Sequence, residues 1–192
     1  VNIGDYGNAI KEYNEAIILD MYYPEAHLAL GKLYYNDNVF PFAFTEFEQA
    51  YKNKDRIVDK QDYYELLYLM AKTRYIEAYE TSIPEKLKKT YIKEGIQYAT
   101  EALLINPDAV ELLYILGVMY YKNSEPDDVT AKKTFEKIIE LDPTHIDAYI
   151  ALSELYLKHK NADKASYYSQ KALTIDPANE RARFLYRITK EK

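Results

Sequence analysis

Apolar side chains near the start of the sequence recur at every third or fourth position. Tyr6, Ile10, Tyr13 and Ile17 follow this spacing, which places them on one face of an α-helix. Similar segments follow along the whole chain, separated by short polar stretches. We expect ten helices, at about residues 7–20, 24–37, 41–53, 60–80, 84–105, 109–122, 127–141, 145–158, 162–175 and 178–190.

Several of these segments resemble one another at a fixed period. Residues 105–122, 141–158 and 175–190 align by eye, and their prolines Pro107, Pro143 and Pro177 are 36 and 34 residues apart. An earlier segment, Tyr22–Asp37, has the same form. Self-similarity at such a period indicates stacked structural repeats.

Each repeat contains two motifs. The first places a small residue between larger ones, as in Leu30-Gly31-x-x-Tyr34, Leu116-Gly117-x-x-Tyr120 and, with a substitution, Leu152-Ser153-x-x-Tyr156. The second reads Ala9-x-x-x-Tyr13-x-x-Ala16, Ala43-x-x-x-Phe47-x-x-Ala50 and Ala131-x-x-x-Phe135-x-x-Ile138, with weaker versions starting at Gly95 and Ala165. Together these residues resemble the tetratricopeptide repeat, a helix–turn–helix whose first and second helices carry these motifs.

The resemblance implies an all-α fold, a right-handed superhelix (α-solenoid) of antiparallel helix pairs. We expect one array over residues 1–192. Its parts would be a partial repeat 1–23, a repeat 24–57, an enlarged repeat 58–107, repeats 108–143 and 144–177, and a C-terminal capping helix 178–192.

Glycine inside a helix costs about 0.5–1 kcal/mol relative to alanine. Gly31 and Gly117 therefore predict points where a second helix crosses closely, with Ala43 and Ala131 as its small residues. Phe47 and Phe135 would be large residues filling the space between helix pairs. The place of the family's large apolar residue is held by His27, Leu113 and Tyr149, so we expect His27 to be packed in the core.

The pattern changes in three places. The first segment reads as a second helix without its first helix, which predicts a fragment of a longer protein and an open face for dimerisation. The turn ETSIPEK, residues 80–86, joins two long helices and is either a tolerated insertion or a docking element. The last helix carries Arg181, Arg183 and Arg187, which suit a polar cap or an acidic partner.

Four helix starts contain pairs that fit a capping box. They are Asp108 with Glu111, Thr144 with Asp147, Ser82 with Glu85, and Ser124 with Asp127. We attribute Asp127 and Asp128 to the helix dipole rather than to catalysis.

No candidate for catalysis, cofactor binding or metal binding emerges. The sequence contains no cysteine, and His27, His145 and His159 do not have the i, i+4 spacing of a helical metal site. Phosphate-binding glycine loops and the Gly-x-Ser-x-Gly nucleophile motif are also absent from the sequence. We expect no enzymatic activity and no cofactor.

Charge and hydropathy limit the classes of partner that we expect. The net charge of −6 argues against nucleic acid as the main partner. No uncharged apolar run reaches about 18 residues, so we expect no membrane insertion. Without cysteines or a visible signal peptide, the cytoplasm and the periplasm both remain open. The excess of lysine over arginine and the many tyrosines suggest an AT-rich, bacterial genome.

The resemblance implies that the first helices line a groove for a partner. The residues expected to face it are Leu28, Lys32 and Tyr35 in the second repeat, Tyr114, Val118 and Tyr121 in the fourth, and Ile150 and Glu154 in the fifth. Alternatively, the tyrosines pack between neighbouring first helices. The register of the enlarged repeat leaves its groove residues unassigned. The clamp with which some family members grip chaperone carboxylates is absent, because Leu28, Lys32, Ile115 and Asp147 hold its places.

Tyrosine-rich first helices favour a scaffold that binds an amphipathic helix or an extended apolar peptide of a protein partner. The alternative is a regulatory or substrate-recruiting module of a larger enzyme whose catalytic domain is outside this chain. A peptide-sensing regulator would need a DNA-binding helix-turn-helix nearby, and this sequence shows none.

Overall fold

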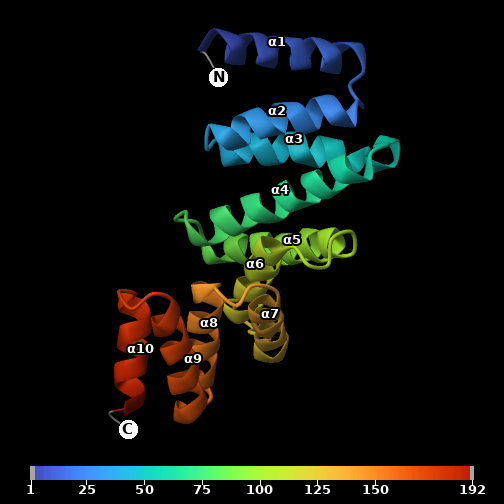
Figure 1. Ribbon diagram of the computed structural model, residues 1–192. Helices are drawn as coiled ribbons and strands as arrows, with labels where there is room; N and C mark the ends of the chain where they lie inside the picture. Colours follow the sequence, from blue (N-terminus) through green and yellow to red (C-terminus); the bar gives the residue numbers. More distant parts are fainter. Residues whose placement is uncertain (1–2, 191–192) are drawn as a thin grey trace. The chain divides into compact units, whose positions relative to one another are not determined.

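The computed structural model describes residues 3–190 of the chain, with side chains from Gly7 onward. Within that range the regular structure is helical throughout (Figure 1). The helices are α1 (Ile3–Leu19), α2 (Pro24–Asn36), α3 (Phe40–Lys52), α4 (Lys60–Tyr79), α5 (Glu85–Leu103), α6 (Val110–Tyr121), α7 (Asp128–Leu141), α8 (Ile146–Lys158), α9 (Ala162–Ile175) and α10 (Glu180–Lys190), with a short 3₁₀ helix η1 (Lys54–Arg56).

These bounds confirm the expected helices to within about two residues, apart from the start of α1. The capping pairs, however, were wrong. Residue Asp127 itself caps α7 by accepting a hydrogen bond from the Thr130 N–H, and the His145 ring caps α8 by accepting one from the Ala148 N–H. Helices α5 and α6 begin after Pro84 and Ala109, which make no side-chain capping bond.

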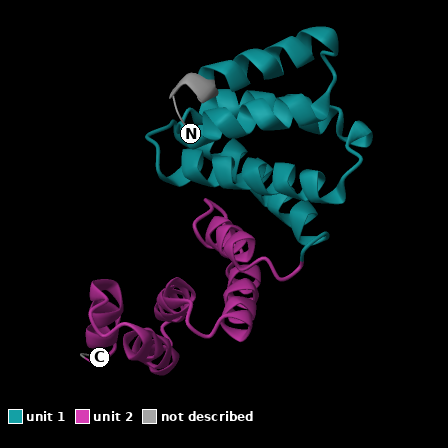
Figure 2. Ribbon diagram, turned by 45° about the horizontal axis from the view of Figure 1, so that its top comes forward, with its two compact units in different colours: residues 1–106 teal, residues 107–192 magenta. Residues whose placement is uncertain are grey.

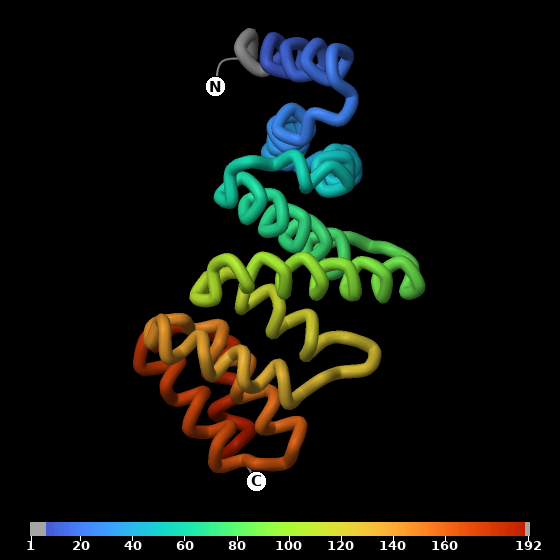
Figure 3. Tube along the Cα trace, turned by 90° about the vertical axis from the view of Figure 1, so that its right-hand side faces the viewer, coloured from blue at the N-terminus to red at the C-terminus, as the bar shows by residue number. Residues whose placement is uncertain are grey.

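The contacts divide the chain into two compact units, coloured separately in Figure 2. Unit 1 comprises residues 1–106 and unit 2 comprises residues 107–192. Each is built from sequential helices that reverse direction at short turns, as the chain trace shows (Figure 3). The division into six parts, with its boundaries, stays a prediction.

Within each unit, the most extensive contacts join helices that follow each other in the sequence. In unit 1 these are α2 with α3 and α4 with α5, and in unit 2 they are α6 with α7 and α8 with α9. Helix α10 packs against α9 and α8, and α1 against α2. The all-α class built from antiparallel helix pairs is thus confirmed.

The two glycines lie where a second helix approaches closely, as expected. A Cβ placed on Gly31 would lie 2.5 Å from the Phe47 ring of α3, and one on Gly117 would lie 2.7 Å from the Phe135 ring of α7. Both rings are fully buried. In the α8–α9 pair the same place holds Ser153, whose buried hydroxyl donates to the Ala165 carbonyl at 2.8 Å.

The enlarged pair consists of two unusually long helices. Helices α4 and α5 contain 20 and 19 residues, whereas helices α2 and α3 contain 13 each. Its base is held by Glu101 of α5, which accepts hydrogen bonds from Tyr51 at 2.8 Å, from Lys54 at 3.1 Å and from Tyr63. The extra turns therefore lie at the opposite end, next to the turn that joins α4 and α5.

Candidate protein-binding faces

The face predicted on α2 is partly used for packing within unit 1. Leu28 is only 5% exposed and belongs to the core. Lys32 pairs with Glu65 of α4 at 2.7 Å. The half-buried Tyr35 packs edge-on against Phe40, with ring centroids 5.5 Å apart. Lys32 and Tyr35 thus retain accessible surface, whereas Leu28 does not.

Helix α4 carries a polar aromatic stripe that was not among the predicted residues. Tyr64, Tyr68, Lys72 and Tyr75 recur at intervals of four, four and three residues and are all half-buried. The rings of Tyr64 and Tyr68 stack with centroids 6.4 Å apart, and the Lys72 ammonium donates to the Tyr68 hydroxyl at 3.0 Å. The Lys32–Glu65 ion pair ties α4 to α2 beside this stripe. The helical spacing alone could have revealed it.

In unit 2, the predicted residues of α6 and α8 differ in their exposure. Val118 is only 3% exposed and packs in the core. Tyr114 is half-buried, and its ring contacts Phe135 at 6.1 Å and His145 at 5.3 Å between centroids. Ile150 is also half-buried and packs on the cluster around Tyr149. The tyrosine therefore packs against α7 and the α8 cap while keeping part of its ring exposed.

Tyr121 and Glu154 lie in a group of charges formed by α6, α7, α8 and α10. Arg181 of α10 contacts Glu154 at 2.6 Å, and the Lys158 ammonium lies 5.7 Å from the Tyr121 ring centroid. Burial raises the pKa of Tyr121, and the nearby carboxylates of Glu154 and Asp128 add to that effect. The phenol therefore remains a neutral hydrogen-bonding group at physiological pH.

The Asp128 carboxylate is largely buried at the start of α7. It pairs with Lys158 at 2.6 Å and with the His159 ring at 2.8 Å, both at the end of α8. Asp128 thus links α7 to the end of α8, in addition to its favourable position at the N-terminus of α7. A pocket of about 260 Å³ lies beside it, and its lining includes Val129, Leu155 and Tyr156 together with Asp128 itself.

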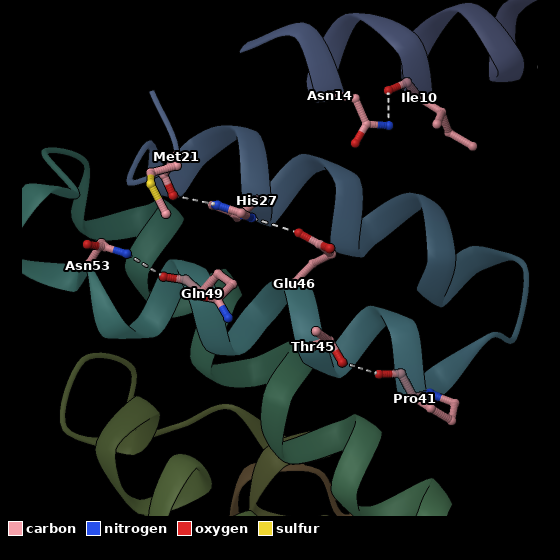
Figure 4. A network of polar contacts seen from close by, with 9 residues as sticks. All are labelled: Ile10, Asn14, Met21, His27, Pro41, Thr45, Glu46, Gln49 and Asn53. Atoms are coloured by element: carbon pink, nitrogen blue, oxygen red, sulfur yellow. Dashed lines mark hydrogen bonds and ion pairs between the residues drawn. The ribbon is translucent and has the colours of Figure 1, made fainter. Parts of the chain in front are cut away.

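His27 is a core residue, as expected. It is 6% exposed, and its Nδ1 lies 2.7 Å from the Glu46 carboxylate of α3. Its Nε2 lies 3.2 Å from the Met21 carbonyl, so both nitrogens are engaged (Figure 4). This ring therefore holds α2, α3 and the preceding turn together.

No group of three or more histidines and carboxylates in residues 3–190 could hold a metal ion. No described helix is long and apolar enough to cross a membrane.

Comparison with known families matches two separate stretches of the chain. A family model described as "TPR repeat" matches residues 2–38, and one described as "Tetratricopeptide repeat" matches residues 134–165. The first match covers α1 and α2, and the second covers α8 with most of α7.

Two curated relatives match this chain over part of their own length. Tetratricopeptide repeat protein 21A of Mus musculus is 26% identical over 84 residues, covering 44% of this chain and 6% of that protein. A DnaJ homolog subfamily C member 7 homolog of Dictyostelium discoideum is 25% identical over 183 residues, covering 88% of this chain and 32% of that protein. The chain thus spans a third or less of the length of these two relatives.

Among solved structures, the fold is similar to that of YrrB, described as a TPR protein with an unusual peptide-binding site. The TM-score is 0.75 at 21% identity, and the alignment covers 96% of this chain and 85% of YrrB. This likeness concerns the fold. The two family matches, together with the glycine–phenylalanine packing of the helix pairs, show a tetratricopeptide-repeat chain with tandem repeats.

Proposed function

We propose that this chain is a protein-interaction module that binds a peptide or helix of a partner on the exposed faces of its first helices. The observation that carries the proposal is the set of half-buried tyrosines on α4 and α6. Tyr64, Tyr68, Tyr114 and Tyr121 are held in place by neighbours and still present surface. Rings fixed in this way lose little entropy when a partner packs on them.

The chemistry of these faces favours an amphipathic or extended apolar partner segment. Tyrosine provides a large apolar area with a hydroxyl at its edge, and such residues dominate many interfaces. Charges at the rim of the faces, Lys32 with Glu65 and Arg181 with Glu154, are already paired. Recognition therefore depends more on aromatic contact than on a single charge, and we propose neither nucleic acid nor a chaperone carboxylate as the ligand.

Quantitative affinity capture tests this proposal. The intact chain would be compared with a Tyr114→Ala/Tyr121→Ala variant and with Tyr167→Ala, which removes an exposed ring from α9. We expect the double variant to bind the partner with an affinity at least about tenfold lower, which corresponds to about 1.4 kcal/mol of binding free energy. Circular dichroism would verify the fold. Equal capture by all three proteins would remove the first-helix face as the binding surface.

A regulatory or substrate-recruiting module of a larger enzyme is the alternative. Both curated relatives are at least three times longer than the segment they share with this chain. An activity assay on a longer protein containing this chain, with and without the tyrosine substitutions, distinguishes the two. A change in turnover for a substrate recruited through this chain would favour the alternative.

We further propose that the chain self-associates through α1. The motif residues Ala9, Tyr13 and Ala16 keep partial exposure, whereas their counterparts on α3, beginning with Ala43, are fully buried. This face is the one that the neighbouring first helix covers in the α2–α3 pair. A second copy of the chain could cover it. The side chain of Tyr6, expected on the same face, lies outside the described residues.

A further inference from the structure

The long α4–α5 pair forms a cavity next to the turn between α2 and α3. The cavity has a volume of about 340 Å³. Its walls include Phe40 and Pro41 at the start of α3, Glu77 and Thr81 at the end of α4, Ile83 in the turn, and Tyr91 on α5. All these residues belong to unit 1, and none is one of the tyrosines on which the proposed function rests.

Glu77 brings a buried carboxylate to this cavity. The residue is 5% exposed, and its Oε2 lies 2.6 Å from the Arg74 guanidinium on the preceding turn of α4. Arg74 is 8% exposed and lies between two rings, 3.2 Å from the centroid of Phe44 and 4.0 Å from that of Tyr91. The guanidinium is therefore fixed by stacking as well as by charge.

The charges around Arg74 do not balance. Arg74 also faces Glu94 of α5, whose side chain is 32% exposed, with Nε and Oε2 2.6 Å apart, so one cation serves two carboxylates. Neither of these two atoms makes a well-aligned hydrogen bond. Burial raises the pKa of Glu77 even though Arg74 opposes that effect, and Glu94 adds to it. The cluster thus carries one more carboxylate than cations, and a second cation beside Glu77 would compensate this negative charge.

We propose that this cavity binds a lysine or arginine side chain of the protein that the chain recognises. The inference rests on the proposed function, since it gives the partner a second anchoring point outside the tyrosine faces. Charge complementarity selects the occupant, because Glu77 supplies the carboxylate at the wall and Phe40 and Tyr91 supply aromatic surface for the aliphatic stem and the cationic head. A neutral or anionic side chain would add no positive charge to this cluster of two carboxylates and one guanidinium.

Titration of the isotope-labelled full chain with N-acetyl-arginine amide, followed by NMR, tests the cavity directly. We expect saturable shifts at the amides of Thr81, Ile83 and Tyr91. The neutral analogue N-acetyl-citrulline amide has nearly the same shape and should produce none. Equal shifts with both compounds, or no shifts with either, would overturn the proposal.

Two variants test whether Glu77 is the residue that binds the arginine amide. Glu77→Gln should weaken arginine-amide binding about tenfold or more, because it removes the charge at the cavity wall. Glu80→Gln, at an exposed position directly after the same helix that does not line the cavity, should leave binding unchanged. Equal affinities for these two variants would reject Glu77 as the anchor.

Ile83→Trp provides a second route that leaves the buried ions intact. Its larger ring would fill the cavity and abolish the shifts, so the proposal stays testable even if Glu77→Gln alters the fold. Undiminished binding by Ile83→Trp would contradict a site in this cavity. Partner capture that depends on Tyr114 and Tyr121 while arginine amide fails to bind would reject this inference and leave the proposed function standing.

Discussion

The phenyl ring of Phe47 occupies the space into which a side chain at Gly31 would point. A Cβ on Gly31 would lie 2.5 Å from ring carbon Cε1 and 3.2 Å from the Ala43 carbonyl oxygen. The relationship recurs in unit 2, where Gly117 meets the ring of Phe135. The two residues are therefore sterically complementary: the missing side chain of the glycine provides the space that the phenylalanine ring fills.

Replacing Gly31 by alanine should destabilise the fold. The added methyl group overpacks the contact with Phe47, at a cost of about 1–3 kcal/mol. That cost exceeds the gain of about 0.5–1 kcal/mol from better helix propensity. Urea unfolding measures the change in the free energy of unfolding. Gly7→Ala is the control, because a Cβ there meets nothing within 4 Å. If Gly31→Ala and Gly7→Ala unfolded at the same urea concentration, the close approach would be refuted.

In the α8–α9 pair two small residues replace the glycine and the phenylalanine, and enlarging one of them should require shrinking the other. Ser153 and Ser169, both fully buried, hold the places of the glycine and the phenylalanine. Ser169→Phe alone should destabilise by about 1–3 kcal/mol, because the ring meets the Ser153 side chain. Adding Ser153→Gly should recover part of the loss, as a double-mutant cycle would measure. Strictly additive effects would contradict the pairing.

Glu101 should contribute stability that depends on pH. Burial tends to raise its pKa, but hydrogen bonds from Tyr63, Tyr51 and Lys54 outweigh burial and hold the pKa below its ordinary value of 4.5. The folded state therefore favours the carboxylate, and the stabilisation is present above pH 4.5 and is lost as pH falls through the lowered pKa.

Glu101→Gln should accordingly lower the unfolding free energy by about 1–3 kcal/mol at neutral pH. Denaturant unfolding at pH 7 and at about pH 3 checks it, and the difference from wild type should shrink in acid. Glu140→Gln, an exposed carboxylate on α7, serves as the control. A loss that stayed the same at both pH values would show that the charge of Glu101 is not responsible.

Self-association through α1 should respond to Tyr13. We expect Tyr13→Glu to weaken association at least about tenfold, since a buried unpaired carboxylate at an interface costs more than 1.4 kcal/mol. Sedimentation velocity over a range of concentrations measures this. Tyr167→Glu on α9 introduces the same charge elsewhere. A wild-type chain that remains monomeric at about 100 μM, or equal effects of both variants, would disprove dimerisation through this helix.

The sequence was most informative where one residue type is physically constrained. A glycine inside a helix, as at Gly31, predicts a close crossing, and the ring four residues after Ala43 predicts what fills it. Capping was predicted less well, because several polar residues compete near each helix start. In the turn before α8, Asp142 accepts hydrogen bonds from the N–H and the hydroxyl of Thr144, which leaves His145 as the cap.

The candidate sites were only partly predictable. Helix periodicity distinguishes one face from another, but Leu28 and Val118 sit at the edge of the predicted face and turn into the core. The cavity beside Glu77 depends on pairing Arg74 with Glu94, which are 20 residues apart and meet only through packing of the α4–α5 hairpin. No local pattern in the sequence signals that contact.

Site-specific photocrosslinking tests the central claim most directly. Benzoylphenylalanine would replace Tyr68 on α4, Tyr114 on α6 or Tyr167 on α9, one at a time, in the intact chain. The account predicts crosslinks to one and the same partner from positions 68 and 114, and none to it from position 167. Crosslinks to that partner from position 167 alone would contradict binding on the first-helix faces.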